Sequence, residues 1–246
     1  MITVAGDPHT IYAVNLRIHE SAPIVSTTAR TFAKICHLMD GLLTSRKPLI
    51  GILADMRVTI EPHNPEWPLK FSEIHDQLRD ILKDVNIISI EHVGSTSIPS
   101  LMAKPVLDID IIIQTSSLEA ARNALKIAEY TDCGEMNVPG RFAFRQPGYG
   151  RFDAAHGKGK DGELRYNTYL MIEGCAALRN HLDTKRVLMG DQELREEYAR
   201  VKSKLTEIEF ENIGQYAFGK TEILCKILRT AGWSEKDLEP VIRANS

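Results

Sequence analysis

Residues 91–113 read EHVGSTSIPSLMAKPVLDIDIII, and this stretch decides the fold. Its beginning continues the β-branched segment 87–93, which predicts a strand that runs into Gly94. Its end, residues 106–114, is the most strongly strand-like part of the chain. Asp108 and Asp110 alternate there with apolar residues, so both carboxylates are expected on one face of that strand.

The segments on either side of this stretch alternate between strand and helix patterns. Such an alternation predicts an α/β core with additional helices at its C-terminal end. We expect strands at residues 57–61 and 164–173, and a strand with a turn within 136–145. Apolar spacing predicts helices over residues 69–85, 117–130, 176–189, 191–209, 211–230 (whole or broken) and 234–244.

Composition limits the possible classes of protein. The chain has 246 residues, of which 43% are apolar and 26% charged, so a sizeable core can be buried. Its net charge of −3 excludes a basic coat for nucleic acid, and any polyanion site must be local. The four cysteines form no CxxC pair and are expected to be buried free thiols. No apolar run approaches a membrane span, and a cytoplasmic location is expected.

The N-terminal region differs from the rest of the chain. Residues 1–55 are expected to form an extension of low order or loose docking, with an amphipathic helix near 27–44. Residues 1–45 contain few acidic residues and resemble a transit peptide weakly, although Asp7 and Glu20 argue against one. The main domain is expected at residues 56–232, followed by a tail helix within 233–246.

The turn after the first strand carries small and hydroxyl-bearing residues. Gly94 would let a phosphate group approach the backbone, and successive N–H groups can form an anion-binding concavity. The hydroxyls of Ser95, Thr96 and Ser97 would add hydrogen-bond donors. The alternative interpretation is an ordinary capped start of a helix.

Asp108 and Asp110 are the strongest candidate functional residues. Two like charges on a largely apolar strand are unfavourable unless a cation or a cationic ligand offsets them. Mg²⁺ is commonly held by one or two carboxylates together with substrate phosphates. Lys104, in the preceding loop, is expected to meet a phosphate or a carboxylate. The alternatives are a solvated edge-strand face and a surface lysine.

Further candidates come from the glycine-rich segment that follows and from the end of the first strand. The segment contains Arg141, Arg145, Lys158 and Lys160, and a mobile basic loop of this kind suits a phosphate-rich substrate or an RNA backbone. A solvated loop is the alternative. His92 is a candidate general base or, alternatively, a structural histidine. Among the hydroxyls, Ser95 is expected to stabilise an oxyanion or to accept an acyl group.

The stretch 91–113 resembles the GrpB-like family, whose members share the nucleotidyltransferase fold. The segments 60–67, 139–145 and 180–220 contain further matches, so the resemblance covers about residues 57–232. It implies a mixed β-sheet flanked by helices. Ser100 stands where the family has glycine, Asn167 where many relatives have histidine, and the helix around Lys185 lacks their Arg-Asp pair. These departures indicate a remodelled substrate pocket.

Within the family the chain looks most like fungal members, some of which resemble arginine-containing cyclodipeptide synthases. That resemblance implies arginyl-tRNA and a second aminoacyl-tRNA as partners, with Asp108, Asp110 or Glu91 receiving the arginine guanidinium. Three functions remain open. The resemblance favours formation of an arginine-containing cyclic dipeptide in fungal secondary metabolism. The alternatives are Mg²⁺-dependent nucleotidyl transfer to a small molecule and ligand binding without catalysis on the same fold.

Overall fold

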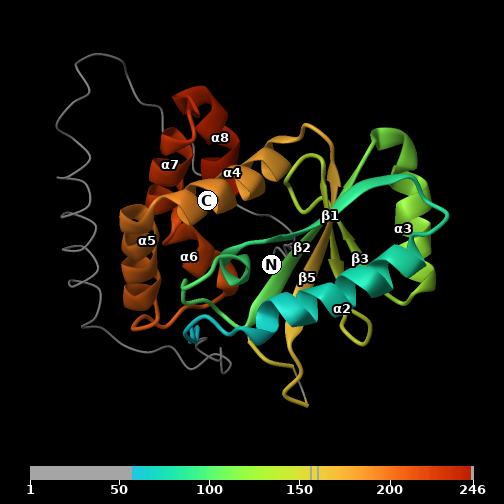
Figure 1. The fold of residues 1–246 in the computed structure, drawn as a ribbon, viewed down its shortest axis with the longest axis horizontal. Helices are drawn as coiled ribbons and strands as arrows, with labels where there is room; N and C mark the ends of the chain where they lie inside the picture. The colour runs from blue at the N-terminus through green and yellow to red at the C-terminus, as the bar shows by residue number, and fades with distance from the viewer. Residues whose placement is uncertain (1–56, 156, 160, 245–246) are drawn as a thin grey trace, which may run out of the picture. The chain divides into compact units, whose positions relative to one another are not determined.

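The computed structural model describes residues 57–155, 157–159 and 161–244 (Figure 1). The helix expected near residues 27–44 and Lys160 lie outside these ranges. The helices are α2 (Glu66–Ile81), α3 (Leu118–Ile127), α4 (Ala176–Gly190), α5 (Gln192–Leu205), α6 (Ile213–Phe218), α7 (Thr221–Thr230) and α8 (Glu235–Ala244). The strands are β1 (Ile87–Val93), β2 (Val106–Ile113), β3 (Thr131–Gly134), β4 (Arg141–Arg145) and β5 (Arg165–Ile172).

These strands form one mixed sheet in the order β1-β2-β5-β4-β3. Strands β2 and β5 are parallel, and the other neighbouring pairs are antiparallel. The predicted mixed sheet flanked by helices, with a C-terminal helical segment, is therefore confirmed. None of the helices in the described part of the chain is both long and apolar enough to span a membrane.

Two individual elements differ from what the sequence predicted. Residues 57–61 do not form a strand but only an isolated bridge from Glu61 to Ala103, because Pro62 and the prolines after it prevent a longer ladder. Strand β3 was not expected, since its short sequence TDCG has no apolar alternation. The helix expected over 211–230, whole or broken, is present as the broken form, with α6 and α7 separated where Gly219 follows Phe218.

The first face of the sheet is apolar and is covered by α2 and α3. Strand β2 contributes Leu107, Ile109 and Ile111 to this face, each fully buried. They pack against Leu78 of α2 and Leu125 of α3 in the largest hydrophobic cluster of the domain. We call this the apolar face of the sheet.

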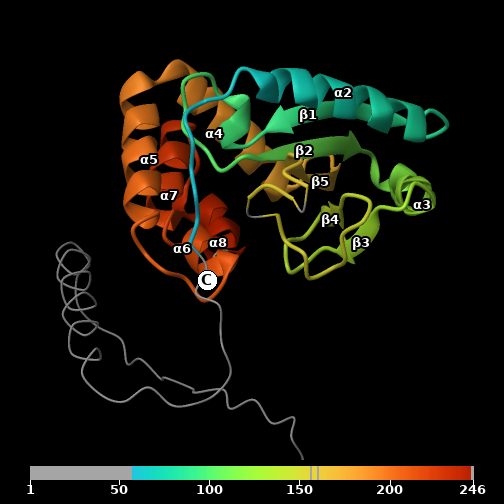
Figure 2. The same ribbon diagram turned by 90° about the horizontal axis from the view of Figure 1, so that it is seen from below.

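The second face carries the residues that alternate with these. The strand pairing places Asp108 beside Asn167 and Asn167 beside Arg145, while Asp110 lies beside Tyr169. We call this the polar face of the sheet. The C-terminal helices gather beside one end of the sheet (Figures 1 and 2). Helix α2 lies along the sheet and extends away from these helices (Figures 1 and 2). Helices α4, α5 and α7 share a second apolar cluster, which includes Leu188, Tyr198 and Ile227.

Candidate functional site

A pocket of about 1000 Å³ lies between the polar face and the C-terminal helices. It extends from Lys104, just before β2, to Glu173, just after β5, and so follows the length of these two parallel strands. Its lining contains seven lysines and arginines but only two carboxylates, Asp108 and Glu173. The seven cations are Lys104, Arg141, Arg145, Lys185, Lys202, Lys220 and Arg243.

The pocket cations have no carboxylate partners. None of the seven forms an ion pair with any carboxylate in the described ranges. Surface cations such as Arg122 and Lys226, in contrast, pair with Asp132 and Glu197. Because the protein as a whole is acidic, this pocket is a local region of positive charge suited to an anionic ligand.

The turn between β1 and β2 brings the backbone against Asp108. Gly94 has φ +69°, and a Cβ atom at this position would lie 2.5 Å from Asp108 Oδ2. Only glycine combines this conformation with so close an approach. Ser95 to Ser97 then form a short 3₁₀ helix, and the Ser97 hydroxyl donates to the Gly94 carbonyl at 2.7 Å. Ser95 and Thr96 line the pocket, whereas Ser97 does not.

Three neighbouring strands contribute a row of linked polar side chains. Asn167 Nδ2 donates a hydrogen bond of 3.0 Å to Asp108 Oδ1, and its Oδ1 accepts one of 3.4 Å from Arg145 Nη1. Arg145 is only 6% exposed, and its Nε has no partner in the described ranges. The amide of Asn167 thus separates a half-buried carboxylate from a buried guanidinium and orients both.

Asp110 lies on the same face as Asp108 but deeper, and helix α4 covers it. Its side chain is fully buried, and Oδ2 lies 2.8 Å from His181 Nδ1. Its other oxygen, Oδ1, is buried without a hydrogen-bond partner in the described part of the protein. The shared strand face predicted for the two aspartates is present, but Asp108 lines the pocket and Asp110 does not.

Three lysines from different elements converge at one end of the pocket. Lys104 precedes β2, Lys202 belongs to α5 and Lys220 directly precedes α7. Lys202 is 2% exposed, and its Nζ donates to the Met102 carbonyl. The ammonium of Lys202 lies 4.8 Å from the centroid of the Tyr198 ring, and that of Lys220 lies 4.6 Å from the centroid of Tyr216. We call these three residues the lysine cluster.

Burial and mutual repulsion weaken the charge on this cluster. Burial lowers the pKa of Lys202 to about 6, helped by the neighbouring charges of Lys220 and Lys104. Burial and Lys220 lower the pKa of Lys104 to about 8, against the opposing effect of Asp108. Burial also lowers the pKa of Lys220. An anion that pairs with these amines would restore their charged forms.

His92 lies on the apolar face, opposite the side that carries the pocket. It is 7% exposed, its ring stacks on Phe71 at 4.8 Å, and its Nε2 lies 3.0 Å from Thr96 Oγ1. Burial lowers the pKa of His92 to about 4. These contacts support the structural interpretation of this histidine, because it does not line the pocket.

The structure therefore brings most of the predicted site residues together. Those that line the pocket are Gly94, Ser95, Thr96, Lys104, Asp108, Arg141 and Arg145. The two arginines belong to strand β4, in agreement with the strand expected within 136–145, and not to the mobile basic loop suggested by their charge. Lys158 is exposed beside a separate, smaller pocket, so it does not join the others. The roles of all these residues remain predictions.

Sequence reasoning missed His181, Lys202 and Lys220 as site residues. A signal for the lysines is present in the sequence as a repeated Tyr-x3-Lys spacing, at 198–202 and at 216–220. On a helix this spacing places the lysine one turn from the tyrosine, so that the ammonium can lie over the ring. No comparable local signal marks His181, since its partner Asp110 lies 71 residues away in the sequence.

A family model and two curated proteins resemble most of this chain. A family model described as "GrpB protein" matches residues 57–230. UPF0157 protein BH1888 of Halalkalibacterium halodurans is 29% identical over 175 residues, which cover 71% of this chain and 82% of that protein. UPF0157 protein YqkA of Bacillus subtilis is 31% identical over 185 residues, which cover 74% of this chain and 48% of that protein.

Solved structures were compared as well. The crystal structure of the conserved protein GrpB from Enterococcus faecalis superposes with a TM-score of 0.56 at 22% identity, covering 71% of this chain and 100% of that one. This likeness shows a shared fold. Cid1 in complex with the UTP analogue UMPNPP superposes with a TM-score of 0.32 at 10% identity, too slight a likeness to carry an argument.

Proposed function

This chain belongs to the GrpB family, and we propose that it is a transferase whose pocket binds a phosphate-bearing donor through the lysine cluster. One observation carries the proposal, namely that six of the seven pocket cations, all except the exposed Arg243, are buried or half-buried, and that none of them has a carboxylate partner in the described ranges. Burying unpaired charge is costly for the folded protein. A ligand with several phosphate oxygens would supply the missing partners, and lysine is a common phosphate-binding residue.

Nucleotidyl transfer to a small acceptor is the function that this arrangement supports best. The lysine cluster would hold the polyphosphate of a nucleotide, and the Gly94-Ser95 turn would lie beside the phosphate that is transferred. Asp108 faces this point, since a Cβ on Gly94 would collide with its carboxylate. Ser95 lines the pocket at this turn, and its hydroxyl would donate to an oxygen on which charge develops.

Mg²⁺ fits the donor atoms at this point, although only one carboxylate reaches the pocket. In the described ranges, no group of three or more His, Cys, Asp or Glu side chains could hold a metal ion. Mg²⁺ typically completes its shell with substrate phosphates and water, so Asp108 alone is a sufficient protein ligand. Asp110 is engaged with His181 and is assigned no metal. When bound, the ion would neutralise charge on the transferred phosphate.

A second candidate is formation of an arginine-containing cyclic dipeptide from aminoacyl-tRNAs, as in fungal secondary metabolism. The observation in its favour is that Asp108 has no cationic side-chain partner among the described residues, although it accepts a hydrogen bond from Asn167. Like Mg²⁺, an arginine guanidinium is a cation that would pair with such a half-buried carboxylate. The lysine cluster would then contact phosphates at the 3′ end of the tRNA.

A parallel assay separates these candidates. The purified full chain is incubated with each ribonucleoside triphosphate, Mg²⁺ and a small-molecule cell extract, and pyrophosphate release is measured. A second reaction contains arginyl-tRNA with mixed aminoacyl-tRNAs and EDTA, and cyclic dipeptides are sought by mass spectrometry. Pyrophosphate release that stops with EDTA supports nucleotidyl transfer, whereas a dipeptide formed in EDTA supports the second candidate.

The same assay has an outcome that contradicts catalysis. If neither product forms while inorganic triphosphate still binds, the protein is a ligand-binding module and not a transferase. Asp108→Asn provides the matched variant, because it removes the charge without removing core volume. Activity is expected to fall by about 100-fold or more, since a group that faces the reacting atoms is neutralised.

A further inference from the structure

Helix α4 places one histidine in the lining of the pocket, in contact with a buried aspartate. His181 Nδ1 and Asp110 Oδ2 are 2.8 Å apart, and Asp110 is completely buried. The His181 side chain is 23% exposed and lines the pocket. A buried carboxylate on one ring nitrogen fixes the orientation and tautomer of an imidazole, and leaves the other nitrogen available for chemistry.

We propose that His181 is the proton acceptor for the nucleophile of the second substrate, with Asp110 as its positioning residue. This inference rests on the proposed transferase function. In nucleotidyl transfer, the acceptor oxygen forms a bond to the α-phosphorus and its proton moves to His181 Nε2. Pyrophosphate leaves with the electron pair of the broken bond, and the histidine later returns the proton to water.

The same role applies to the second candidate reaction. There an amine nitrogen bonds to the ester carbonyl carbon of an aminoacyl-tRNA, and the amine proton moves to His181 Nε2. The tRNA 3′ oxygen leaves with the electron pair of the ester bond and takes up the proton from the histidine. Both reactions require a base that removes a proton from the attacking oxygen or nitrogen. The role assigned to His181 is therefore the same for a nucleotide and for an aminoacyl-tRNA donor.

The geometry makes Nε2 the available nitrogen. Nδ1 is engaged by Asp110, and Nε2 has no hydrogen bond to any residue in the described ranges. The imidazole packs edge-on against the ring of Tyr169, with centroids 5.9 Å apart and an angle of 70° between the planes. Tyr169 is on the polar face of the sheet and also lines the pocket. Its ring supports the imidazole of His181 at the pocket wall.

The charges around His181 come from every strand of the central sheet that faces it. Strand β2 contributes Asp110 and Asp108, β4 contributes Arg141, and Tyr169 comes from β5. Glu91 of β1 pairs in register with Asp110 on the same face. Burial lowers the pKa of His181, but the charge of Asp110 and its hydrogen bond outweigh burial and raise it.

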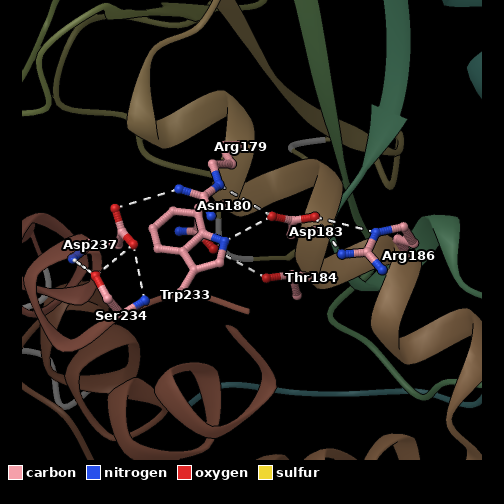
Figure 3. A network of polar contacts seen from close by, with 8 residues as sticks. All are labelled: Arg179, Asn180, Asp183, Thr184, Arg186, Trp233, Ser234 and Asp237. Atoms are coloured by element: carbon pink, nitrogen blue, oxygen red, sulfur yellow. Dashed lines mark hydrogen bonds and ion pairs between the residues drawn. The ribbon is translucent and has the colours of Figure 1, made fainter. Parts of the chain in front are cut away.

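A polar network holds the helix that carries His181 (Figure 3). Asp183, two residues further along α4, accepts a 2.7 Å hydrogen bond from Trp233 Nε1 and forms a 2.7 Å ion pair with Arg186. Arg179 lies over the Trp233 ring at 4.4 Å. These contacts fix α4 against the turn that precedes α8, so the direction of His181 does not depend on a bound ligand.

Chemical modification of histidine tests the assignment without relying on turnover. Diethyl pyrocarbonate reacts with neutral imidazole, and mass spectrometry of the digested full chain measures its reaction rate at each histidine from pH 5 to 8.5. His181 is expected to react with a midpoint above 6.5. In Asp110→Asn, that midpoint falls by at least about one pH unit, because the interaction that raises the pKa is lost.

His75 is the internal control for this experiment. It forms a similar pair with Asp76, at 3.0 Å, but on the exposed surface of α2. Its midpoint should be the same in the wild type and in Asp110→Asn. An unreactive His181, or a midpoint unchanged by Asp110→Asn, overturns the inference.

Measurement of turnover is the second test of the role of His181. With whichever donor is active, His181→Gln is expected to lower turnover about 100-fold while leaving triphosphate binding unchanged. The limb of the pH profile that rises with pH should move to lower pH in Asp110→Asn. Full activity of His181→Gln overturns the inference. If the wild type turns over neither donor, the transferase proposal fails, and the modification experiment still decides whether His181 is an oriented base.

Discussion

The two faces of the sheet are built from the same strands but carry different kinds of side chain, apolar on one face and charged or polar on the other. On β2, the side chains of Leu107, Ile109 and Ile111 are fully buried under α2 and α3, while Asp108 and Asp110 alternate with them on the other side. The apolar face contributes stability through burial of hydrocarbon. The polar face instead carries buried or half-buried charges, of which Asp110 pairs with His181 while Asp108 and Arg145 have no ion-pair partner among the described residues. Such an arrangement is typical of sites that bind ligands at some cost to stability.

Among single substitutions, the largest loss of stability is expected on the apolar face. Ile109→Ala should lower the free energy of unfolding by about 2–5 kcal/mol, because Ile109 is fully buried in the largest hydrophobic cluster and its truncation leaves a cavity there. The adjacent Asp108→Asn should change it by less than about 1 kcal/mol, since the hydrogen bond to Asn167 can be replaced. Urea denaturation of both variants measures the difference. Equal losses would remove the distinction between the faces.

On the pocket side, removal of a buried charge should increase stability. Lys202→Met is expected to raise the free energy of unfolding at pH 6–7 by about 1–4 kcal/mol, the range found when buried charges are replaced by apolar side chains. The pKa of Lys202 is about 6 in the folded protein, below its ordinary value of 10.5. Between these values the unfolded chain binds a proton that the folded chain does not.

This linkage fixes the sign of the pH dependence. Wild-type stability should rise with pH across that window, so the advantage of Lys202→Met should be largest near pH 6 and shrink as the pH approaches 10. Thermal melting at pH 6, 8 and 9.5 tests the trend. A stability difference that stays constant with pH would show that Lys202 is charged in the folded protein throughout.

Proton uptake should accompany anion binding. At pH 7.5, binding of inorganic triphosphate to the lysine cluster is expected to take up about one proton per complex, because pairing restores the charge on Lys202. Calorimetry in buffers with different ionisation enthalpies measures this number. The uptake should decrease in Lys202→Met, and binding to the wild type without any uptake would contradict the lowered pKa of Lys202.

A small loss of stability is also expected where polar groups are fully partnered. Trp233→Phe removes the hydrogen bond to Asp183 but keeps the aromatic packing and the contact with Arg179. Stability should fall by about 1 kcal/mol, since Asp183 retains its ion pair with Arg186. Thermal melting measures the change. A loss as large as that of Ile109→Ala would mean that this network, and not the apolar face, holds the domain together.

Some parts of this structure could be predicted from sequence, and others could not. Alternation along residues 106–113 predicted both faces of β2, because the side-chain period of a strand is two. The same local pattern could not show that Asp110 is buried under α4, since its partner His181 arrives from a distant helix. The depth of a carboxylate depends on tertiary packing, which is why the two aspartates looked equivalent in sequence.

The lysine cluster illustrates the same limit. Lys104, Lys202 and Lys220 come from three separate segments, and only the fold of the C-terminal helices brings them together. The Tyr-x3-Lys spacing gives Lys202 and Lys220 their aromatic neighbours, but not their direction into a shared pocket. The strand expected at residues 57–61 failed for a local reason instead, since the prolines that follow limit pairing to one bridge.

The central claim is that the unpaired cations of the pocket, and the lysine cluster above all, form an anion-binding site. Isothermal titration of inorganic triphosphate into the full chain at pH 6.5 and low salt tests it most directly. Lys226→Met is the matched surface control, because Lys226 is 56% exposed and paired with Glu197. The wild type and this control should bind one triphosphate with equal affinity, and Lys202→Met should bind it at least about tenfold more weakly, a loss of about 1.4 kcal/mol. Absence of binding to the wild type, or equal affinity in Lys202→Met, would contradict the account.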